Sequence, residues 1–519
     1  MRRTLITACL LALCLGALPS TALGASGPES AVPRGPNDEF RWFGGGWGHG
    51  LGMSQYGAYG LSQDGWGAKR ILTHYYSGTK VGTDGTPPKT LRIGLVQGED
   101  VVRLEAETGQ VELRLGDPKT GDLIGTIPEG GTWKVAAAGS DYRIVDAGGA
   151  TVDQTGGPST PIFAVFEEAG SRVRVPDAGH TYNRGWIEFG LYDCGSANDC
   201  VERLILVVEP QGYLYGLAEV PSSWPMSALK AQAIAARSYA FTKAANSQHR
   251  AVCDCALYAS SFDQVFAGWD KEGGVDGDRW VSAVNQTEDE IVKDGGDVIQ
   301  AFYMSSSGGY TENNENVWGG TPIDYLRGVC DPGDYTLANP NATWEVTTTA
   351  SEVTQDLGLG IGTVTRFTNI VRGVSGRILT VMVEGEAGQA EMSGNTLQSA
   401  LGLRDDRVWI NSNRLVTGVI RDKYDALGCS PGLPTSRQVS AAGGARQGFE
   451  QGTIYSSDVA GTHELHGPVL DRYEDEGGPG GALGFPTTDV RQLKNGNVRA
   501  RFENGVITCR ADGSSCSVA

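Results

Sequence analysis

Four segments of the chain combine residue types that could do chemistry. The first is a glycine-rich run from Gly44 to Ala58, whose polar side chains include His49, Ser54 and Gln55. Glycines let the backbone turn tightly, so such a run can expose a few selected groups. We predict that these three residues bind substrate; the alternative is a packed turn with a satisfied histidine. A phosphate-binding loop is not indicated, because no Gly-Lys-Ser or Gly-Lys-Thr ending follows.

The second segment, residues 213 to 225, places a carboxyl group among apolar neighbours. Glu219 is flanked by Ala218, Val220 and Pro221. Apolar surroundings disfavour the ionised form, which raises the pKa of a carboxyl group towards values useful to a general acid. We therefore predict that Glu219 is catalytic; the alternative is an ordinary exposed loop glutamate.

The third and fourth segments, residues 260 to 269 and 301 to 312, alternate aromatic with small polar residues. This composition suits a groove that stacks on sugar faces and hydrogen-bonds their hydroxyl groups. The predicted substrate-binding residues are Gln264, Ser306, Ser307 and Thr311. Ordinary turn chemistry remains the alternative for the serines. The Gly-x-Ser-x-Gly pattern of a serine nucleophile is absent around them.

The cysteines predict disulfides rather than a metal centre. Cys194 and Cys200 flank a short loop without nearby histidines, so we expect them to be bonded to each other. His249, Cys253 and Cys255 offer the ligand types of zinc, while separate disulfides are the alternative for the two cysteines, because a mutual bridge across one residue is strained. We expect no cofactor, with zinc at these three residues as the alternative.

Charge and hydropathy place the protein outside the cytoplasm and exclude a nucleic-acid partner. Arg2 and Arg3 precede an apolar run and small residues, which is typical of a signal peptide over residues 1–24, followed by a linker over 25–39. The formal net charge of −19 leaves no basic field to gather phosphates. We expect a secreted, extracellular or wall-associated protein with no membrane span in the mature chain.

The elements that must position these segments predict an α+β fold. Strong helix formers fill residues 226 to 243, and their many alanines indicate a buried helix. A shorter helix is expected over 67 to 76. Short alternating runs from about 91 to 207 predict a β-rich insertion. We assign residues 40–422 to one mixed domain that contains this insertion.

The last part of the chain contains an internal repeat. Gly432–Thr435 recurs at Gly484–Thr487, and Phe449–Ile454 recurs at Phe502–Ile507. Two blocks at nearly one offset predict a small tandem β module over residues 429–519. The sequence Leu-Gly-Phe-Pro, ending at Pro486, resembles the LGFP repeat of actinobacterial wall proteins. That resemblance implies binding to cell-wall polysaccharide.

Together, the four segments resemble the SpoIID/LytB family, the group of sporulation stage II protein D and the amidase enhancers. The matching features are the Gly-His-Gly-x-Gly-Met-Ser-Gln run, the Tyr-Leu-x-Gly glutamate loop, the Ala-Leu-Lys-Ala-Gln-Ala helix and the Ser-Ser-Gly-Gly-x-Thr block. The resemblance implies a peptidoglycan lytic transglycosylase that acts on glycan strands. It also implies that Glu219 is both acid and base.

The sequence departs from the family pattern at two points, and the second of them supports a rival prediction. The His49 segment precedes the glutamate loop instead of following it, and Gly216 and Glu219 are separated by fewer residues than in the sporulation enzymes. The rival is a non-catalytic, wall-binding enhancer whose partner is an N-acetylmuramoyl-L-alanine amidase. A third alternative, an adhesin or structural wall protein, depends on the repeats and the acidity alone.

Overall fold

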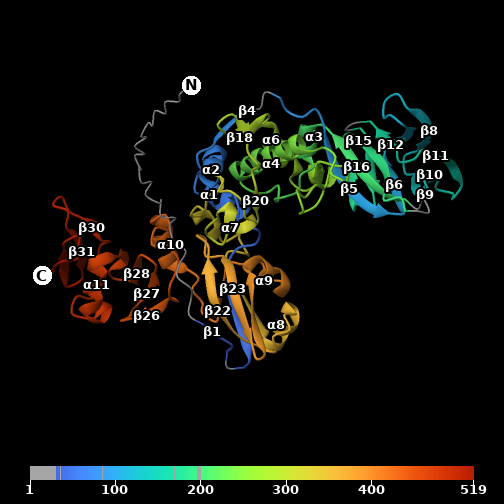
Figure 1. The fold of residues 1–519 in the computed structure, drawn as a ribbon. Coiled ribbons are helices and arrows are strands. Elements are labelled where there is room, and N and C mark those ends of the chain that lie inside the picture. Colours follow the sequence, from blue (N-terminus) through green and yellow to red (C-terminus); the bar gives the residue numbers. More distant parts are fainter. Residues whose placement is uncertain (1–30, 36, 84–85, 168–169, 196–199) are drawn as a thin grey trace, which may run out of the picture.

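The structure, a computed structural model, describes residues 31–35, 37–83, 86–167, 170–195 and 200–519. The predicted signal peptide and residues 25–30 of the predicted linker lie outside the described residues. The predicted α+β class is confirmed. Figure 1 shows a helical centre with a two-sheet body at one end, a second β body below it, and the C-terminal module at the opposite end.

The helical centre, residues 45–83 and 209–335, is built around helix α4 (Met226–Asn246). Its alanines let neighbours approach closely, and α4 packs against α1 (Gln55–Gln63), α2 (Ala68–Tyr75) and α6 (Gly277–Asn285). The predicted buried helix is thus confirmed. The smaller elements are α3 (Pro210–Tyr215), α5 (Trp269–Glu272), α7 (Asn314–Trp318), η1 (Pro332–Tyr335), β3 (Met53–Ser54), β4 (Lys80–Thr83), β17 (Leu257–Tyr258), β18 (Glu290–Asp294), β19 (Asp297–Val298) and β20 (Tyr303–Met304).

The two-sheet body, residues 91–208, packs one sheet on another. The sheet orders are β17-β5-β16-β15-β12-β7-β8 and β11-β10-β9-β6-β13-β14. Its core is continuous with α4, so this body is fixed to the helical centre. The strands are β5 (Leu91–Glu99), β6 (Val101–Thr108), β7 (Val111–Leu115), β8 (Asp122–Ile127), β9 (Thr132–Ala138), β10 (Asp141–Val145), β11 (Thr151–Thr155), β12 (Ile162–Phe166), β13 (Arg172–Val175), β14 (His180–Tyr182), β15 (Trp186–Tyr192) and β16 (Val201–Val208).

A buried acid in this body predicts a distinctive pH dependence of stability. Glu202 on β16 is fully buried, and neither carboxylate oxygen has a hydrogen-bond partner. Burial, with the charges of Asp100 and Asp177, raises the pKa of Glu202 to about 9. The folded state therefore binds a proton that the unfolded chain releases near its ordinary pKa. The contribution of Glu202 to the free energy of unfolding is fully present below the ordinary pKa of a glutamate, and it is lost as the pH rises towards 9.

The expected slope is a loss of about 1.4 kcal/mol in the free energy of unfolding per pH unit between roughly pH 5 and pH 9. Glu202→Gln should flatten this slope in denaturant titrations across that range. The matched control is Glu99→Gln, because Glu99 lies opposite Glu202 in the ladder but is exposed. An unchanged slope in Glu202→Gln would disprove the prediction.

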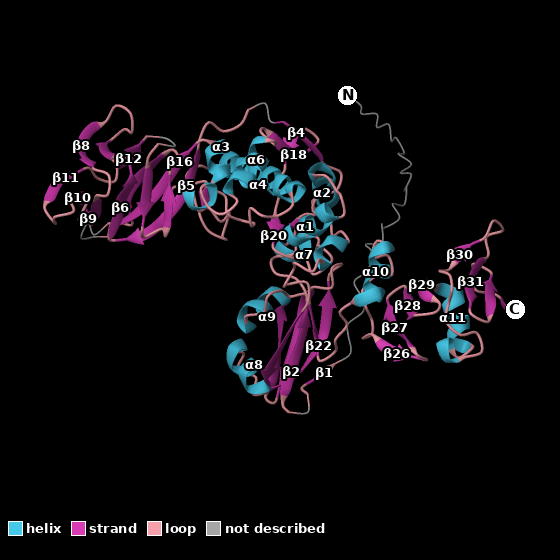
Figure 2. Cartoon of the chain, turned by 180° about the vertical axis from the view of Figure 1, so that it is seen from behind, coloured by secondary structure: helices cyan, strands magenta, loops and turns pink. Residues whose placement is uncertain are grey.

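The lower β body combines residues 32–44 with residues 344–410, which are distant in sequence. Strand β2 (Glu39–Gly44) lies between β21 (Trp344–Thr349) and β25 (Val408–Ile410), and β1 (Val32–Pro33) pairs with β22 (Val364–Arg372). The second sheet continues with β23 (Ile378–Gly385) and β24 (Gly388–Ser393). Figure 2 shows helices α8 (Ala350–Leu357) and α9 (Gly394–Leu401) along one side of these strands. Phe40, Trp42 and Phe367 lie in the shared core.

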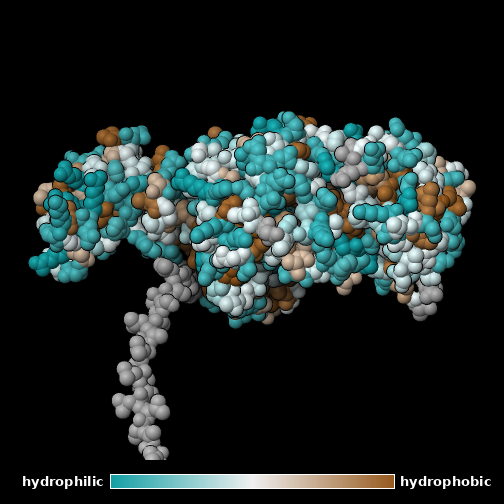
Figure 3. Space-filling model, turned by 90° about the horizontal axis from the view of Figure 1, so that it is seen from above, coloured by the Kyte–Doolittle hydropathy of each residue, from teal (hydrophilic) through white to brown (hydrophobic). Residues whose placement is uncertain are grey.

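The C-terminal module contains two copies of one unit, a helix followed by four antiparallel strands. In the first copy, α10 (Gly418–Ala426) packs on β28 and β29; in the second, α11 (Gly467–Asp475) packs on β31, β32 and β33. The strands are β26 (Val439–Ala441), β27 (Gly444–Phe449), β28 (Gly452–Ser457), β29 (Gly461–Leu465), β30 (Arg491–Gln492), β31 (Val498–Phe502), β32 (Gly505–Cys509) and β33 (Cys516–Val518), with η2 (Gly478–Gly480) after α11. The predicted C-terminal β repeat module is confirmed, and each copy also begins with a helix. Figure 3 shows that hydrophilic residues cover much of this module, at the left of the view.

One disulfide joins two of these parts, and others close local loops. The predicted Cys194–Cys200 bridge is confirmed, and Cys330–Cys429 links the helical centre to the start of the C-terminal module. Another bridge joins Cys509 to Cys516 across β32 and β33. Within the described part of the chain, no helix has the length and apolar character needed to cross a membrane.

Candidate active site

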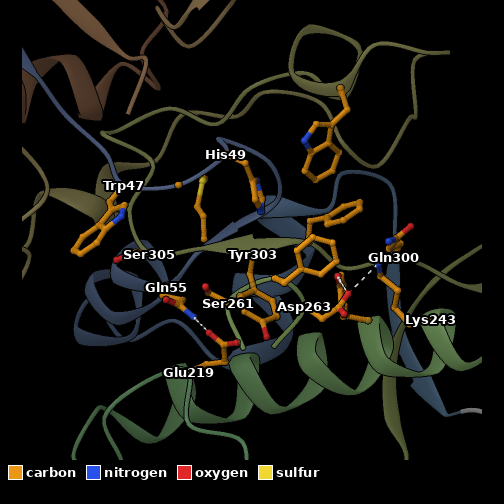
Figure 4. Close-up of a pocket in the computed structure, with 16 residues that line it drawn as sticks. Trp47, His49, Gln55, Glu219, Lys243, Ser261, Asp263, Gln300, Tyr303 and Ser305 are labelled. Atoms are coloured by element: carbon orange, nitrogen blue, oxygen red, sulfur yellow. Dashed lines mark hydrogen bonds and ion pairs between the residues drawn. The ribbon is translucent and has the colours of Figure 1, made fainter. Parts of the chain in front are cut away.

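A cavity of about 630 Å³ opens on the helical centre, beside α4. All four sequence segments contribute to its wall, as Figure 4 shows. Its lining residues are Trp47, Gly48, His49, Gln55, Glu219, Tyr239, Lys243, Ser261, Phe262, Asp263, Gln300, Phe302, Tyr303, Met304, Ser305 and Trp318. Segments separated by more than 250 residues therefore form one site.

Glu219 follows α3 and is held by the third segment. Its Oε1 accepts a hydrogen bond from the Val265 backbone N–H at 2.7 Å, and the Ala218 N–H donates to the Val265 carbonyl oxygen at 2.8 Å. Two backbone contacts thus fix the loop that carries the carboxyl group. The side chain remains half-buried at the cavity wall.

The environment of Glu219 favours its protonated form. Burial raises the pKa of Glu219 above its ordinary value, while hydrogen bonds from the Val265 N–H, the Tyr303 hydroxyl and the Gln55 amide oppose the rise without cancelling it. A carboxyl group with a raised pKa keeps its proton to a higher pH than an ordinary carboxyl group does. Glu219 therefore has the property that a general acid needs.

Strand pairing explains how the first and fourth segments reach Glu219. Met53–Ser54 (β3) pairs in parallel with Tyr303–Met304 (β20). Gly52, directly before β3, has φ +70°, and a Cβ atom there would lie 2.0 Å from the Phe302 carbonyl oxygen. Only glycine permits this approach. Gln55, the first residue of α1, then donates to Oε2 of Glu219 at 3.4 Å (Figure 4).

His49 lines the same cavity but is neutral. Its Nδ1 accepts the Leu51 backbone N–H at 3.0 Å. Burial, helped by the charge of Arg377, lowers the pKa of His49 to about 4, although a hydrogen bond to the Tyr303 backbone opposes the shift. The ring therefore contributes shape and hydrogen bonding to the cavity, and does not supply a proton near neutral pH.

The predicted serines lie below the cavity, where they hold a buried aspartate pair. Ser54 and Ser306 donate to the two oxygens of Asp334, each at 2.8 Å, and Ser307 donates to Asp331 at 2.7 Å. Burial raises the pKa of both aspartates. All three serines have no exposed surface, so the predicted substrate-binding role does not fit them. They position the glycine-rich segments instead.

Gln264 and Thr311 require the same correction, because both are fully buried. Gln264 accepts a hydrogen bond from Tyr213 and donates to the Tyr303 hydroxyl, both at 2.9 Å. Thr311 accepts the Val329 backbone N–H at 2.8 Å. Gln264 thereby orients Tyr303, which hydrogen-bonds Glu219. Of the predicted binding residues, His49 and Gln55 line the cavity with Glu219.

A second carboxyl group in the cavity was not predicted. Burial alone would raise the pKa of Asp263, but the Tyr258 N–H, Arg250 and Lys243 outweigh burial and lower it. Lys243 lies 3.1 Å from Asp263, and the Tyr239 hydroxyl donates to Asp263 at 3.2 Å. Asp263 is thus held ionised while the pKa of Glu219 is raised. The signal that could have indicated Asp263 is its place in the third segment, between aromatic residues.

The zinc alternative is excluded by covalent bonding. Cys253 and Cys255 form a disulfide with each other, so neither offers a thiolate, and His249 instead contacts Asp254 at 2.6 Å. The mutual bridge also corrects the expectation of separate disulfides. Among the described residues, a cluster of Cys330, Asp425 and Cys429 has metal-ligand types, but its cysteines are bonded as well.

Comparisons with known proteins identify two modules. Residues 202–293, which include Glu219 and Asp263, match the family model SpoIID, described as Stage II sporulation protein. Residues 432–481 match the LGFP repeat. The resemblances predicted from the sequence are therefore confirmed over these residues, which match the SpoIID model and the LGFP repeat model.

Two relatives carry related names. The chain is 35% identical over 129 residues to the amidase enhancer of Bacillus subtilis (strain 168). The aligned region covers 25% of this chain and 16% of that protein. It is 29% identical over 249 residues to the stage II sporulation protein D of the same organism. Here the aligned region covers 45% of this chain and 69% of that protein. The chain thus covers less than two thirds of the amidase enhancer.

Proposed function

We propose that this protein is secreted and remodels peptidoglycan, cleaving its glycan strands as a lytic transglycosylase. The observation that carries the proposal is Glu219, a carboxyl group with a raised pKa in the wall of an open, aromatic-lined cavity. The SpoIID match includes this residue, and the names of the two relatives support a role at the cell wall. The four disulfides are compatible with an oxidising compartment.

In the proposed reaction, Glu219 acts first as acid and then as base. It donates its proton to the glycosidic oxygen as the bond from that oxygen to C1 of the muramyl sugar breaks. The resulting carboxylate takes the proton of the 6-hydroxyl group of the same sugar, whose oxygen bonds to C1. The products are a free sugar hydroxyl and a 1,6-anhydro ring, and no water is consumed. One carboxyl group is sufficient for both steps, unlike hydrolysis by a carboxyl pair.

The aromatic residues of the cavity suit a glycan strand. Trp47, Phe262 and Trp318 expose 53%, 73% and 54% of their surfaces. Large exposed rings that line one cavity can stack on the apolar faces of sugar rings. Gln55 and Tyr303 hold the Glu219 carboxyl group, and are positioning residues in this scheme.

The direct test is digestion of glycan strands from which the peptides have been removed. Mass spectrometry should detect products that end in anhydro-muramyl residues. Absence of such products at any protein concentration would refute the enzymatic proposal.

The second candidate function is enhancement of an N-acetylmuramoyl-L-alanine amidase. The relative named amidase enhancer and the short spacing between Gly216 and Glu219 favour it. If it holds, adding the protein to an amidase digest of cell walls should increase the rate of peptide release, and Glu219→Gln should increase it equally. An unchanged rate would count against enhancement. Equal stimulation by the variant would separate it from glycan cleavage.

The C-terminal module supplies the proposed attachment to the wall. The LGFP match covers the four strands of the first repeat and α11 of the second, and both repeats have the same helix and strand arrangement. We assign binding of cell-wall polysaccharide to this module. The Cys330–Cys429 bridge connects it to the body that carries the cavity.

A further inference from the structure

Three arginines gather in a small cavity of the second repeat. Arg491, Arg499 and Arg501 line a space of about 170 Å³ together with Thr488 and Leu493. Arg491 lies opposite Arg499 in the ladder between β30 and β31. Arg499 and Arg501 are two positions apart on β31, so they share a face of the sheet. The fold thus collects three positive charges around one cavity, which we call the arginine pocket.

The arginine pocket has no counter-charge among the described residues. None of its three arginines forms an ion pair there; Arg499 donates to the neutral Thr508 hydroxyl at 3.0 Å. The nearby carboxylates have other partners, since Asp489 binds Lys423 at 2.6 Å and Glu503 accepts the Phe485 N–H at 2.8 Å.

The first repeat shows that the repeat fold does not require this cluster. Arg446 takes the place of Arg499, but it forms an ion pair with Glu474 at 2.9 Å and lies opposite Val439. Gly448 precedes Phe449 where Arg501 precedes Phe502. At these three positions the first repeat therefore has one arginine, which is paired with Glu474, whereas the second repeat has three arginines without an ion pair among the described residues.

We propose that the arginine pocket binds oxyanion groups, phosphate or carboxylate, of an anionic wall polysaccharide. Guanidinium groups match the geometry of both through paired N–H donors, and remain charged at every physiological pH. The exposed side chains of Arg491 and Arg501 leave the cavity open to a polymer. The inference rests on the proposed wall binding and adds a ligand class and a location to it.

The experiment compares the full chain with the double variant Arg491→Gln/Arg501→Gln. Binding is measured to soluble poly(glycerol phosphate), to polygalacturonate as the carboxylate source, and to neutral dextran. Co-sedimentation is measured with intact walls and with walls from which phosphate polymers have been extracted by acid. Arg446→Gln is the matched control, because its arginine is already paired in the first repeat.

We expect the double variant to bind the anionic polymers at least about tenfold more weakly, with binding reduced by salt and the control unchanged. If the double variant loses more affinity for poly(glycerol phosphate), the arginine pocket binds phosphate; if it loses more affinity for polygalacturonate, the pocket binds carboxylate. Equal binding of the double variant and the unaltered chain to both anionic polymers would overturn the arginine pocket. If intact and extracted walls retain every variant equally, the protein binds the wall but the arginine pocket is not responsible. If neither wall preparation retains the unaltered chain, the proposed wall binding itself is wrong.

Discussion

Glu219→Gln should reduce the release of anhydro-muramyl product by about 10²- to 10⁴-fold, the usual contribution of a general acid or base. Glutamine keeps the shape and can still accept the Val265 N–H, but it carries no transferable proton. The activity of the unaltered protein should fall as the pH rises through the raised pKa of Glu219, because its acid form is lost. Product release from stripped glycan strands, measured across pH, checks both statements.

Glu209→Gln is the matched control for this variant. Glu209 directly precedes α3, the helix that Glu219 follows; it is exposed and makes no side-chain capping hydrogen bond. Its substitution should leave both the rate and the pH profile unchanged. If Glu219→Gln retains the rate of this control, Glu219 is not the acid and the proposed reaction is wrong.

Arg377→Met should lower the free energy of unfolding by about 3–5 kcal/mol, the usual cost of breaking a buried ion pair. Arg377 is almost fully buried and lies 2.8 Å from Asp405, which is fully buried too. It also donates to the backbone oxygens of Ser307 and Tyr310, each at 3.1 Å. Removing it leaves a buried carboxylate without its partner and loosens the lower β body from the segment beneath the cavity.

Arg366→Met provides the comparison in the same sheet. Arg366 on β22 pairs with Glu384 at 2.6 Å, but more than half of its side chain is exposed, so the change should stay within about 1 kcal/mol. Denaturant unfolding monitored by tryptophan fluorescence compares the two variants. Similar destabilisation by both would mean that Arg377 does not hold the two bodies together.

The sequence predicts well those features that depend on local pattern. The alanine-rich run from Met226 identified α4 because helix formers and small residues are sufficient to define a buried helix. The apolar residues on either side of Glu219 also predicted its raised pKa, because they are part of the local sequence. The glycines before Gln55 indicated a tight turn, and Gly52 indeed has a positive φ.

Features that depend on distant partners could not be predicted. In the sequence, Ser54, Ser306 and Ser307 resemble sugar-binding residues. In the fold they are buried and donate hydrogen bonds to Asp331 and Asp334, and no local spacing indicates these contacts. Asp263 is ionised because Lys243 and Arg250 approach it from other segments. The pairing of β2 with β21 and β25 joins residues about 300 to 370 positions apart, so periodicity alone could not reveal it.

The Cys330–Cys429 bridge has a consequence for the reach of the molecule. Cys330 directly precedes Asp331, which supports the segments around the cavity, and Cys429 follows α10 of the first repeat. A covalent bond so close to both parts prevents the repeats from swinging away on a long tether. An anchored molecule of this kind would act only on bonds at a short and nearly constant distance from its point of attachment.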